Sequence, residues 1–328
     1  MVRTRDEWNK AGKSAMGAGV ITAVTAAAKF GVTGMPLSPF MTGIVLAILY
    51  SVSFVLLQLF HFSLASKQPA NTASALAAAL DTRRDGDQEV ELVASVTRSQ
   101  TVVTMGNVVA AIPMAIVLVL IGWLLAGKPM LGPETATYAV KSLNPLRTAT
   151  IPYAMVTGVF LWLSSLAAGW AANWNAHRGV AAAVASSARL RRAIGQQGAA
   201  GVARFIDENG SGIVGYVALG VLLGLVPVIL QFIGIPIEVR HVTLHSAQLA
   251  LGAWSLAGST GIVWSDVAWG FAGVVATGIC NFAVSFLLSL RLAMRAREVD
   301  GEQRSRIFEQ IRQAFRQSPR RFLAAPRE

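Results

Sequence analysis

The feature that most constrains this chain is the recurrence of apolar stretches about 20 residues long. A helix of that length crosses the roughly 30 Å hydrocarbon core of a bilayer. Only 14% of the residues are charged, against about 25% in soluble domains. The sequence therefore predicts an all-α polytopic membrane bundle. The five clearest spans lie near 41–65, 105–126, 152–172, 212–235 and 267–290.

Two weaker segments decide the number of spans. The stretch 15–36 is rich in Ala, Gly and Thr and contains Lys29, so it must pack against protein. One arrangement has six spans: the stretch 15–36 spans the membrane, the stretch 246–263 does not, and the N-terminus is cytoplasmic. In that arrangement, 23 of the 28 Lys and Arg residues lie in cytoplasmic segments. Basic residues gather on the cytoplasmic side of membrane proteins. We therefore expect six transmembrane helices, with 246–263 as an interfacial or re-entrant helix.

The same charge distribution predicts a multi-pass protein of the bacterial inner membrane with both termini in the cytoplasm. Residues 1–296 would form the transmembrane domain and 297–328 a basic tail. The tail carries Ile307, Phe308, Ile311 and Phe315 on one helical face. Arginines occupy its other face, which is typical of a helix lying on a membrane surface. We expect anionic inner-leaflet lipids as its partners, and nucleic acid is not favoured because no recognised DNA-binding motif accompanies the arginines.

The spans also show traces of internal repetition. The stretches "SVSFVLLQLFHFSLASK" (51–67) and "FAVSFLLSLRLAMRAR" (282–297) share a Val-Ser-Phe sequence. The stretches "GNVVAAIPMAIVLVLIG" (106–122) and "GYVALGVLLGLVPVILQFIG" (215–234) both place a proline among glycines and aliphatic residues. These similarities suggest three parallel two-helix hairpin repeats, a form of duplication common in membrane carriers.

Polar residues recur at helical spacing on the even-numbered spans. The three stripes are Ser51, Gln58 and His61; Thr157, Ser165, Gly169 and Asn173; and Asn281, Ser285 and Ser289. One interpretation is that they join helices, as Gly220 and Gly224 would do in a GxxxG contact. The other is that the stripes converge on a polar pathway for a small solute. Both interpretations remain open at this stage.

A second candidate site follows the second span, in "HFSLASKQPANTASALAAAL" (61–80). Lys67 and Gln68 precede Pro69, which is how a helix commonly ends. Asn71 or Thr72 would then cap a new helix whose N-terminal amides point back toward Lys67. A cation beside a helix N-terminus favours an anion such as a lipid phosphate or an acidic solute. The segment is therefore either a helix end or an anion-binding site.

Glu238, His241 and His245 are weak candidates for a metal site because their spacing would place them on one helical face. The β-branched residues between them favour an extended outer-face loop instead. No P-loop, GxSxG, HExxH or GxGxxG motif occurs. We therefore expect neither a metal nor a cofactor, and nothing in the sequence indicates an enzyme. Ser265 and Asp266 are expected to cap the last span.

Several unusual motifs resemble the bacterial multi-span membrane proteins labelled "site-specific recombinase". The matching pieces are "HFSLASKQPANTA" (61–73), "RSQTVVTMGNVVAAIP" (98–113), "IPYAMVTGVFLWLSSLAAGWAAN" (151–173), "IGIPIEVRHVTL" (233–244) and "GICNFAVSFLLSLRLAMRAR" (278–297). The resemblance covers most of residues 1–297 and implies that the chain corresponds to the C-terminal membrane half of a longer protein. It also implies a role in DNA recombination.

Three functional hypotheses follow from these observations. The first is a non-enzymatic membrane protein that moves or holds a small anionic or lipidic solute through a polar intramembrane pathway. The second is a membrane scaffold or assembly subunit whose protein partner, or missing N-terminal region, does the work. The third is the recombination role that the family label carries, although no recombinase catalytic constellation is visible among the four tyrosines and the arginines.

Overall fold

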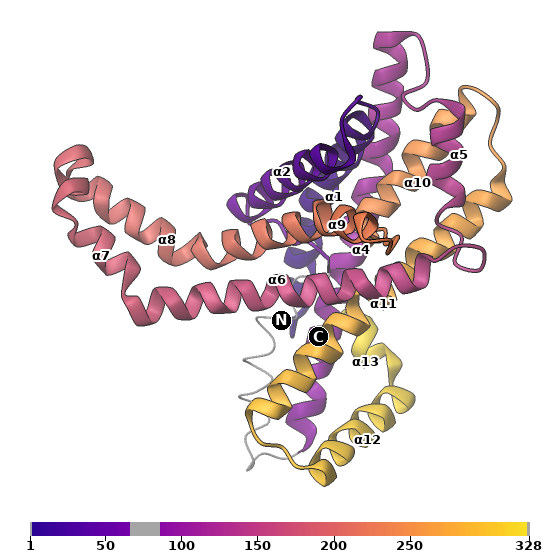
Figure 1. Ribbon diagram of the computed structural model, residues 1–328. Helices are drawn as coiled ribbons and strands as arrows, with labels where there is room; N and C mark the ends of the chain where they lie inside the picture. The colour runs from indigo at the N-terminus through magenta and orange to yellow at the C-terminus, as the bar shows by residue number, and fades with distance from the viewer. Residues whose placement is uncertain (1, 66–85, 327–328) are drawn as a thin grey trace.

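The computed structural model describes residues 2–65 and 86–326, and every regular element in these ranges is a helix (Figure 1). Six of the helices are long and apolar enough to cross a membrane, which confirms the predicted all-α membrane bundle. The six are α1 (Arg5–Thr33), α2 (Pro39–Leu59), α4 (Gly86–Ala126), α6 (Thr150–Arg178), α8 (Ala188–Gly224) continuing into α9 (Val226–Phe232), and α11 (Trp264–Ala296).

The remaining helices are shorter. They are α5 (Pro133–Lys141), α7 (Val180–Ser186), α10 (Val242–Ala257), α12 (Gly301–Gln317) and α13 (Pro319–Leu323). One of them, α7, lies in the arm described below, and the others lie at the two ends of the bundle or inside it. We call the end with α5 and the start of α6 and α11 the α5 end. The opposite end, with α12, α13 and the first turns of α4, is the tail end.

The local sequence explains where these helices begin and end. The Thr4 hydroxyl accepts from the Glu7 amide and the Glu7 carboxylate accepts from the Thr4 amide, which forms a capping box at the start of α1. Ser38 caps α2 and Pro39 occupies its first turn, where a missing N–H costs nothing. Gly179, in the left-handed conformation at φ 57°, ends α6.

Most of the packing joins helices that are not neighbours in the sequence. The helix α1 packs on α4, α2 packs on α8, and α6 lies between α8 and α11. The hairpin hypothesis instead pairs α4 with α6 and α8 with α11, and neither pair forms a main contact of the fold. The similarities between the spans therefore do not correspond to three hairpins that each pack on themselves.

Several predicted spans differ from the helices at their ends. The helix α2 stops at Leu59 rather than at 65, and His61 adopts a positive φ of 55°. The predicted span 212–235 is the second half of a helix that begins at Ala188 and is interrupted at Leu225, just before Pro227. Proline removes one backbone donor and clashes with the preceding turn. Together, α6, α7 and the first half of α8 form an arm that extends away from the bundle (Figure 1).

The predicted interfacial or re-entrant helix is α10, which begins four residues earlier than expected. It packs against α1, α4, α5 and α11, and nearly all of its residues are buried. Its first residue bonds to the middle of α11, whereas Ser255 near its end bonds to Leu131 at the α5 end. The chain thus enters the bundle through an extended segment, turns at His241 and returns along α10. This is a re-entrant path; where a bilayer lies around it stays a prediction.

The basic tail packs on the protein itself. Ile307 of α12 and Phe322 of α13 are buried in a separate apolar cluster with Val93 of α4 and Leu290 of α11. Glu91 of α4 forms an ion pair with Arg321. The face that was expected to lie on lipid is therefore partly occupied by the start of α4 and the end of α11.

The GxxxG motif forms a close contact between α8 and α2. A Cβ at Gly220 would collide with the backbone of Ser51, and one at Gly224 with the backbone of Ala47. These two glycines let the helices approach until their backbones touch, as small residues do in membrane bundles.

We predict that Gly224→Ala destabilises the protein by about 1–3 kcal/mol, because the new methyl group forces α8 away from α2. The matched control is Gly201→Ala in the arm part of the same helix, where a Cβ meets nothing within 4 Å. Thermal unfolding in detergent should show a lower midpoint for the first variant only. Equal midpoints would contradict the close approach of the two helices.

Candidate functional site

The stripe on α11 is buried and bonded within the protein. The Asn281 amide donates to the Ala154 and Arg240 carbonyls, both at 2.9 Å, and its oxygen accepts from the Val242 amide at 3.1 Å. The Ser285 hydroxyl donates to the Asn281 carbonyl one turn away. Ser289 is buried as well. This stripe joins helices and lines none of the cavities described below.

The second stripe meets the α11 stripe at Arg240, where the Thr157 hydroxyl accepts from the Arg240 amide and the Arg240 carbonyl accepts from Asn281. The first stripe bonds elsewhere. The Gln58 amide donates to Asn209 at 3.3 Å and the Ser51 hydroxyl donates to the Val217 carbonyl, so both join α2 to α8. His61 lies exposed beyond the end of α2, and Asn173 is exposed on the arm. Lys67, Gln68, Asn71 and Thr72 lie outside the described residues, so the anion site at 61–80 stays a prediction.

Asn107 of α4 is a second buried asparagine that mirrors Asn281. Its oxygen accepts from the Ala65 amide at 3.1 Å and from the Thr243 hydroxyl at 2.9 Å. Its amide donates to the carbonyls of Ala15 and Ser63, both at 2.9 Å. Asn107 and Asn281 thus hold the first two residues of α10 from opposite sides. All hydrogen-bonding groups of both side chains are satisfied, as burial in an apolar bundle requires.

Arg240 lies two residues before the start of α10, and it is 3% exposed. Its guanidinium forms an ion pair with Glu238 at 2.8 Å and donates to the Ser142 carbonyl at 3.0 Å. Its backbone amide donates to the Thr157 hydroxyl at 2.9 Å. A buried charge is tolerated only when it is paired and hydrogen-bonded, and Arg240 meets both conditions.

His245 accepts a hydrogen bond from Arg240, because a guanidinium can only donate. Its Nε2 lies 3.1 Å from Arg240, and its Nδ1 lies 2.9 Å from the His241 carbonyl. Nδ1 must therefore carry the proton, and His245 is the neutral tautomer. Both ring nitrogens are occupied, which leaves none for a metal.

The three weak metal candidates do not share one helical face. Glu238 lies in the extended segment, His241 caps α10 and only His245 lies within that helix. Across residues 2–65 and 86–326, no group of three or more His, Cys, Asp or Glu side chains could hold a metal ion. The segment before α10 is extended, as the β-branched residues favour. Its place on the outer face stays a prediction.

Two tyrosines hold the extended segment in place. The Tyr153 hydroxyl of α6 donates to the Pro236 carbonyl at 2.7 Å, and the Tyr138 hydroxyl of α5 donates to Glu238 at 2.8 Å. Partial burial, with the Glu238 carboxylate beside it, raises the pKa of Tyr138 to about 12. Tyr138 therefore stays protonated near neutral pH and remains a donor to the carboxylate.

A cavity of about 360 Å³ opens beside this segment. Its polar lining comes from Lys29 of α1, Tyr138, Gln231 of α9, Glu238, His245 and Gln248 of α10. Its apolar lining includes Leu46, Leu223, Val228 and Leu244. The Lys29 Nζ lies 3.4 Å from the Gln248 amide oxygen and 5.6 Å from the centre of the Phe30 ring. None of the described carboxylates lies within 4 Å of it, whereas Glu238 is paired with Arg240.

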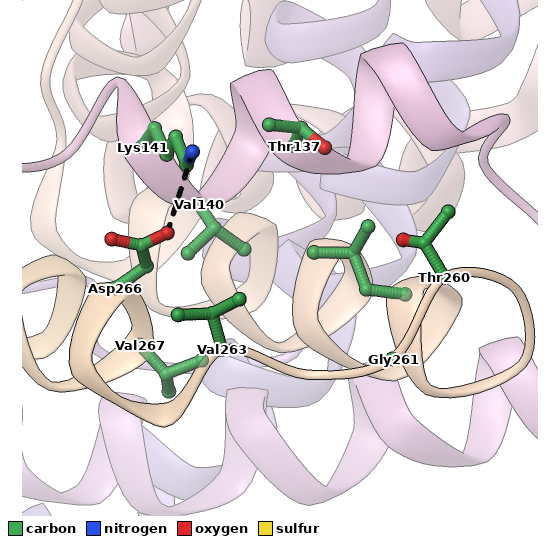
Figure 2. A pocket seen from close by; sticks show the side chains of 9 residues that line it. Thr137, Val140, Lys141, Thr260, Gly261, Val263, Asp266 and Val267 are labelled. Carbon is green, nitrogen blue, oxygen red and sulfur yellow. Dashed lines mark ion pairs between the residues drawn. The ribbon is translucent and has the colours of Figure 1, made fainter.

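A smaller cavity of about 80 Å³ lies between α5 and α11. Figure 2 shows Lys141 reaching from α5 toward Asp266 in the first turn of α11, with their charged atoms 3.6 Å apart. The helix begins at Trp264 with Val263 as its N-cap, so the expectation that Ser265 caps it was wrong. Asp266 does lie in the first turn, as expected. This space has room for a few water molecules.

The chain matches the family described as "Site-specific recombinase" over residues 1–325. It belongs to that family. No curated protein and no solved structure matches the chain significantly. The resemblance seen in the sequence motifs is thereby confirmed.

Sequence reasoning missed the residues that organise this region. From the sequence, Lys29 indicates only that its span packs against protein. A charged residue within a span is also a signal of function. Arg240 and Asn107 are not among the site residues predicted from the sequence, although Asn107 lies in the motif "GNVVAAIP". An asparagine in an otherwise apolar span was the available signal for Asn107.

We predict that Asn107→Leu destabilises the protein by about 2–3 kcal/mol, because it leaves the Ala65 amide and the Thr243 hydroxyl buried without their partner. Asn173→Leu, at an exposed position on the arm, is the control and should change little. Chemical unfolding in mixed micelles measures both. A change below 1 kcal/mol in the first variant would mean that the α10 N-terminus is held by other contacts.

Proposed function

We propose that this member of the site-specific recombinase family is a membrane protein that binds a small acidic solute in the cavity between α1, α9 and α10. The observation that carries the proposal is Lys29, whose ammonium group lines the cavity. Within the described ranges it has an amide oxygen and an aromatic ring beside it but no carboxylate within 4 Å. An ammonium group without an opposite charge is costly at such depth. A carboxylate or phosphate bound in the cavity would supply that charge.

The rest of the lining supports a ligand with both polar and apolar parts. Gln231 and Gln248 supply amide groups, and Tyr138 lies at one side. Leu46, Leu223 and other aliphatic residues supply an apolar wall. A volume of about 360 Å³ falls within the range of small-molecule sites, roughly 300–1,000 Å³. The chemistry favours an organic anion with an apolar portion over an inorganic ion.

Movement of the solute through the bundle would require a rearrangement of α10. Asn107, Asn281 and the start of α10 fill the middle of the bundle. The two asparagine side chains bond to Thr243 and Val242, the first residues of α10. In the polar stripes that would have formed a pathway, Ser51, Gln58, Thr157, Asn281 and Ser285 are likewise bonded to protein. The proposal is therefore a binding site open to one side, with α10 as the element that separates it from the tail end.

A second candidate is the recombination-associated role that the family name carries. The observation in its favour is the exposed basic surface of the arm, which includes Arg178, Arg189 and Arg192. Against a strand-transfer activity, Tyr138 and Tyr153 donate to groups at the α5 end, whereas Tyr50 and Tyr216 are buried. This candidate predicts binding of duplex DNA that persists above physiological salt; binding lost with modest salt would reflect charge alone.

We predict that Lys29→Met abolishes binding of organic acids without lowering stability. A panel of carboxylates and organic phosphates, screened by thermal shift, should include ligands that raise the unfolding midpoint of the parent protein. A ligand at 100 times its dissociation constant stabilises by about 2.7 kcal/mol. In Lys29→Met the shift should vanish. The ligand-free midpoint should stay equal or rise, because a partly buried charge has been removed.

The matched control is Lys141→Met, which removes a lysine at the same end of the bundle that is paired with Asp266 and lies outside this cavity. It should keep the full ligand shift, and Lys29→Arg should keep part of it. An unchanged shift in Lys29→Met, or the same loss in both methionine variants, would contradict the proposal.

A further inference from the structure

A second cavity lies on the outside of the bundle, between α4 and α11. It is a groove of about 650 Å³ whose walls run from Thr97 to Val109 on α4 and from Phe271 to Ala283 on α11. Its floor includes Val242, the first residue of α10. Twelve helical steps of 1.5 Å give it a length of roughly 18 Å. That is slightly more than one leaflet of a hydrocarbon core about 30 Å thick.

The groove is almost entirely apolar, and its rim is exposed. Met105, Val109 and Ile279 are 57%, 59% and 64% exposed. Apolar side chains of this size on the outside of a membrane bundle face lipid tails. The few polar residues of the groove, Thr97 and Thr101 among them, lie toward the tail end, where lipid headgroups would begin.

The tail closes that end of the groove with two apolar side chains, Phe315 of α12 and Leu323 of α13. Arginines flank both: Arg316 follows Phe315, and Arg320 lies one turn before Leu323. Three other arginines of the tail are neutralised. Arg306 pairs with Glu302, Arg312 with Glu309, and Arg321 with Glu91. Arg316 and Arg320 are exposed and form no ion pair within 4 Å among the described residues.

We propose that this groove holds an acyl chain of an anionic phospholipid, with the phosphate of its headgroup on Arg316 and Arg320. The length of the groove fits one leaflet, and the two arginines lie next to Phe315 and within one turn of Leu323, the side chains that close its polar end. The tail would thus bind the membrane through a specific lipid as well as through general attraction to a charged surface. This site lies apart from the Lys29 cavity and does not depend on the function proposed for it.

Native mass spectrometry tests the proposal on the whole protein, released from nanodiscs of phosphatidylethanolamine and phosphatidylglycerol. We expect one phosphatidylglycerol retained per chain. Arg316→Glu with Arg320→Glu should lower its retention by about tenfold or more. Arg304→Glu with Arg306→Glu, on the same helix away from the groove, should leave it unchanged.

A second pair of variants tests the groove without altering charge. Ala283→Trp fills the groove and should also abolish retention, whereas Leu287→Trp, at a half-exposed position of α11 outside it, should not. Equal retention in both tryptophan variants would overturn the proposal, as would equal retention of the two lipids by the parent protein or retention of neither.

A third outcome concerns a second copy of the chain. With Cys280→Ser, an Ile279→Cys variant in membranes should remain monomeric after oxidation, because lipid covers the groove. Efficient disulfide-linked dimers would instead show that another copy occupies this face, and would overturn the proposal.

Discussion

The fold depends on two buried asparagines that hold the start of α10 in the middle of the bundle. Asn107 bonds to α1, to the segment after α2 and to Thr243, while Asn281 bonds to α6, Arg240 and Val242. A chain that turns back inside a membrane exposes backbone groups that lipid cannot satisfy. The two side-chain amides supply the missing partners. Elements from both halves of the sequence therefore meet at one point, and the extended segment before α10 can enter the bundle.

This arrangement determines what each end of the molecule can do. Because α10 returns toward the α5 end, the space between α1, α9 and α10 becomes a cavity, and Lys29 lines it. The same two asparagines close the middle, so the cavity does not continue through the bundle. Arg240 and Glu238 neutralise each other at its side. Lys29 is left as the charge that the proposed solute would recognise, whereas the arginines of the tail end are the groups proposed to bind lipid.

The sequence was sufficient to predict the class of fold, because spans 20 residues long and the placement of basic residues follow directly from bilayer physics. It also indicated a helix near 246–263 that does not span. It could not show which helices pack together, since small and polar stripes look alike whether they join helices or line a pathway. Asn281 illustrates this, because its stripe is at regular spacing and yet is fully bonded to protein. The cavity was out of reach because its residues come from five separate segments that only the fold brings together.

Our central proposal is that α10 bounds a cavity reached from the α5 end, and that both termini are cytoplasmic. Labelling by a membrane-impermeant maleimide, in intact cells and in inverted vesicles, tests it most directly. In a Cys280→Ser background, cysteines at Thr33 and Gln231, which line the cavity, should react only from outside the cytoplasmic membrane. A cysteine at Asn173 should react only from the cytoplasmic side. Labelling of Thr33→Cys and Gln231→Cys from the cytoplasmic side would contradict the account.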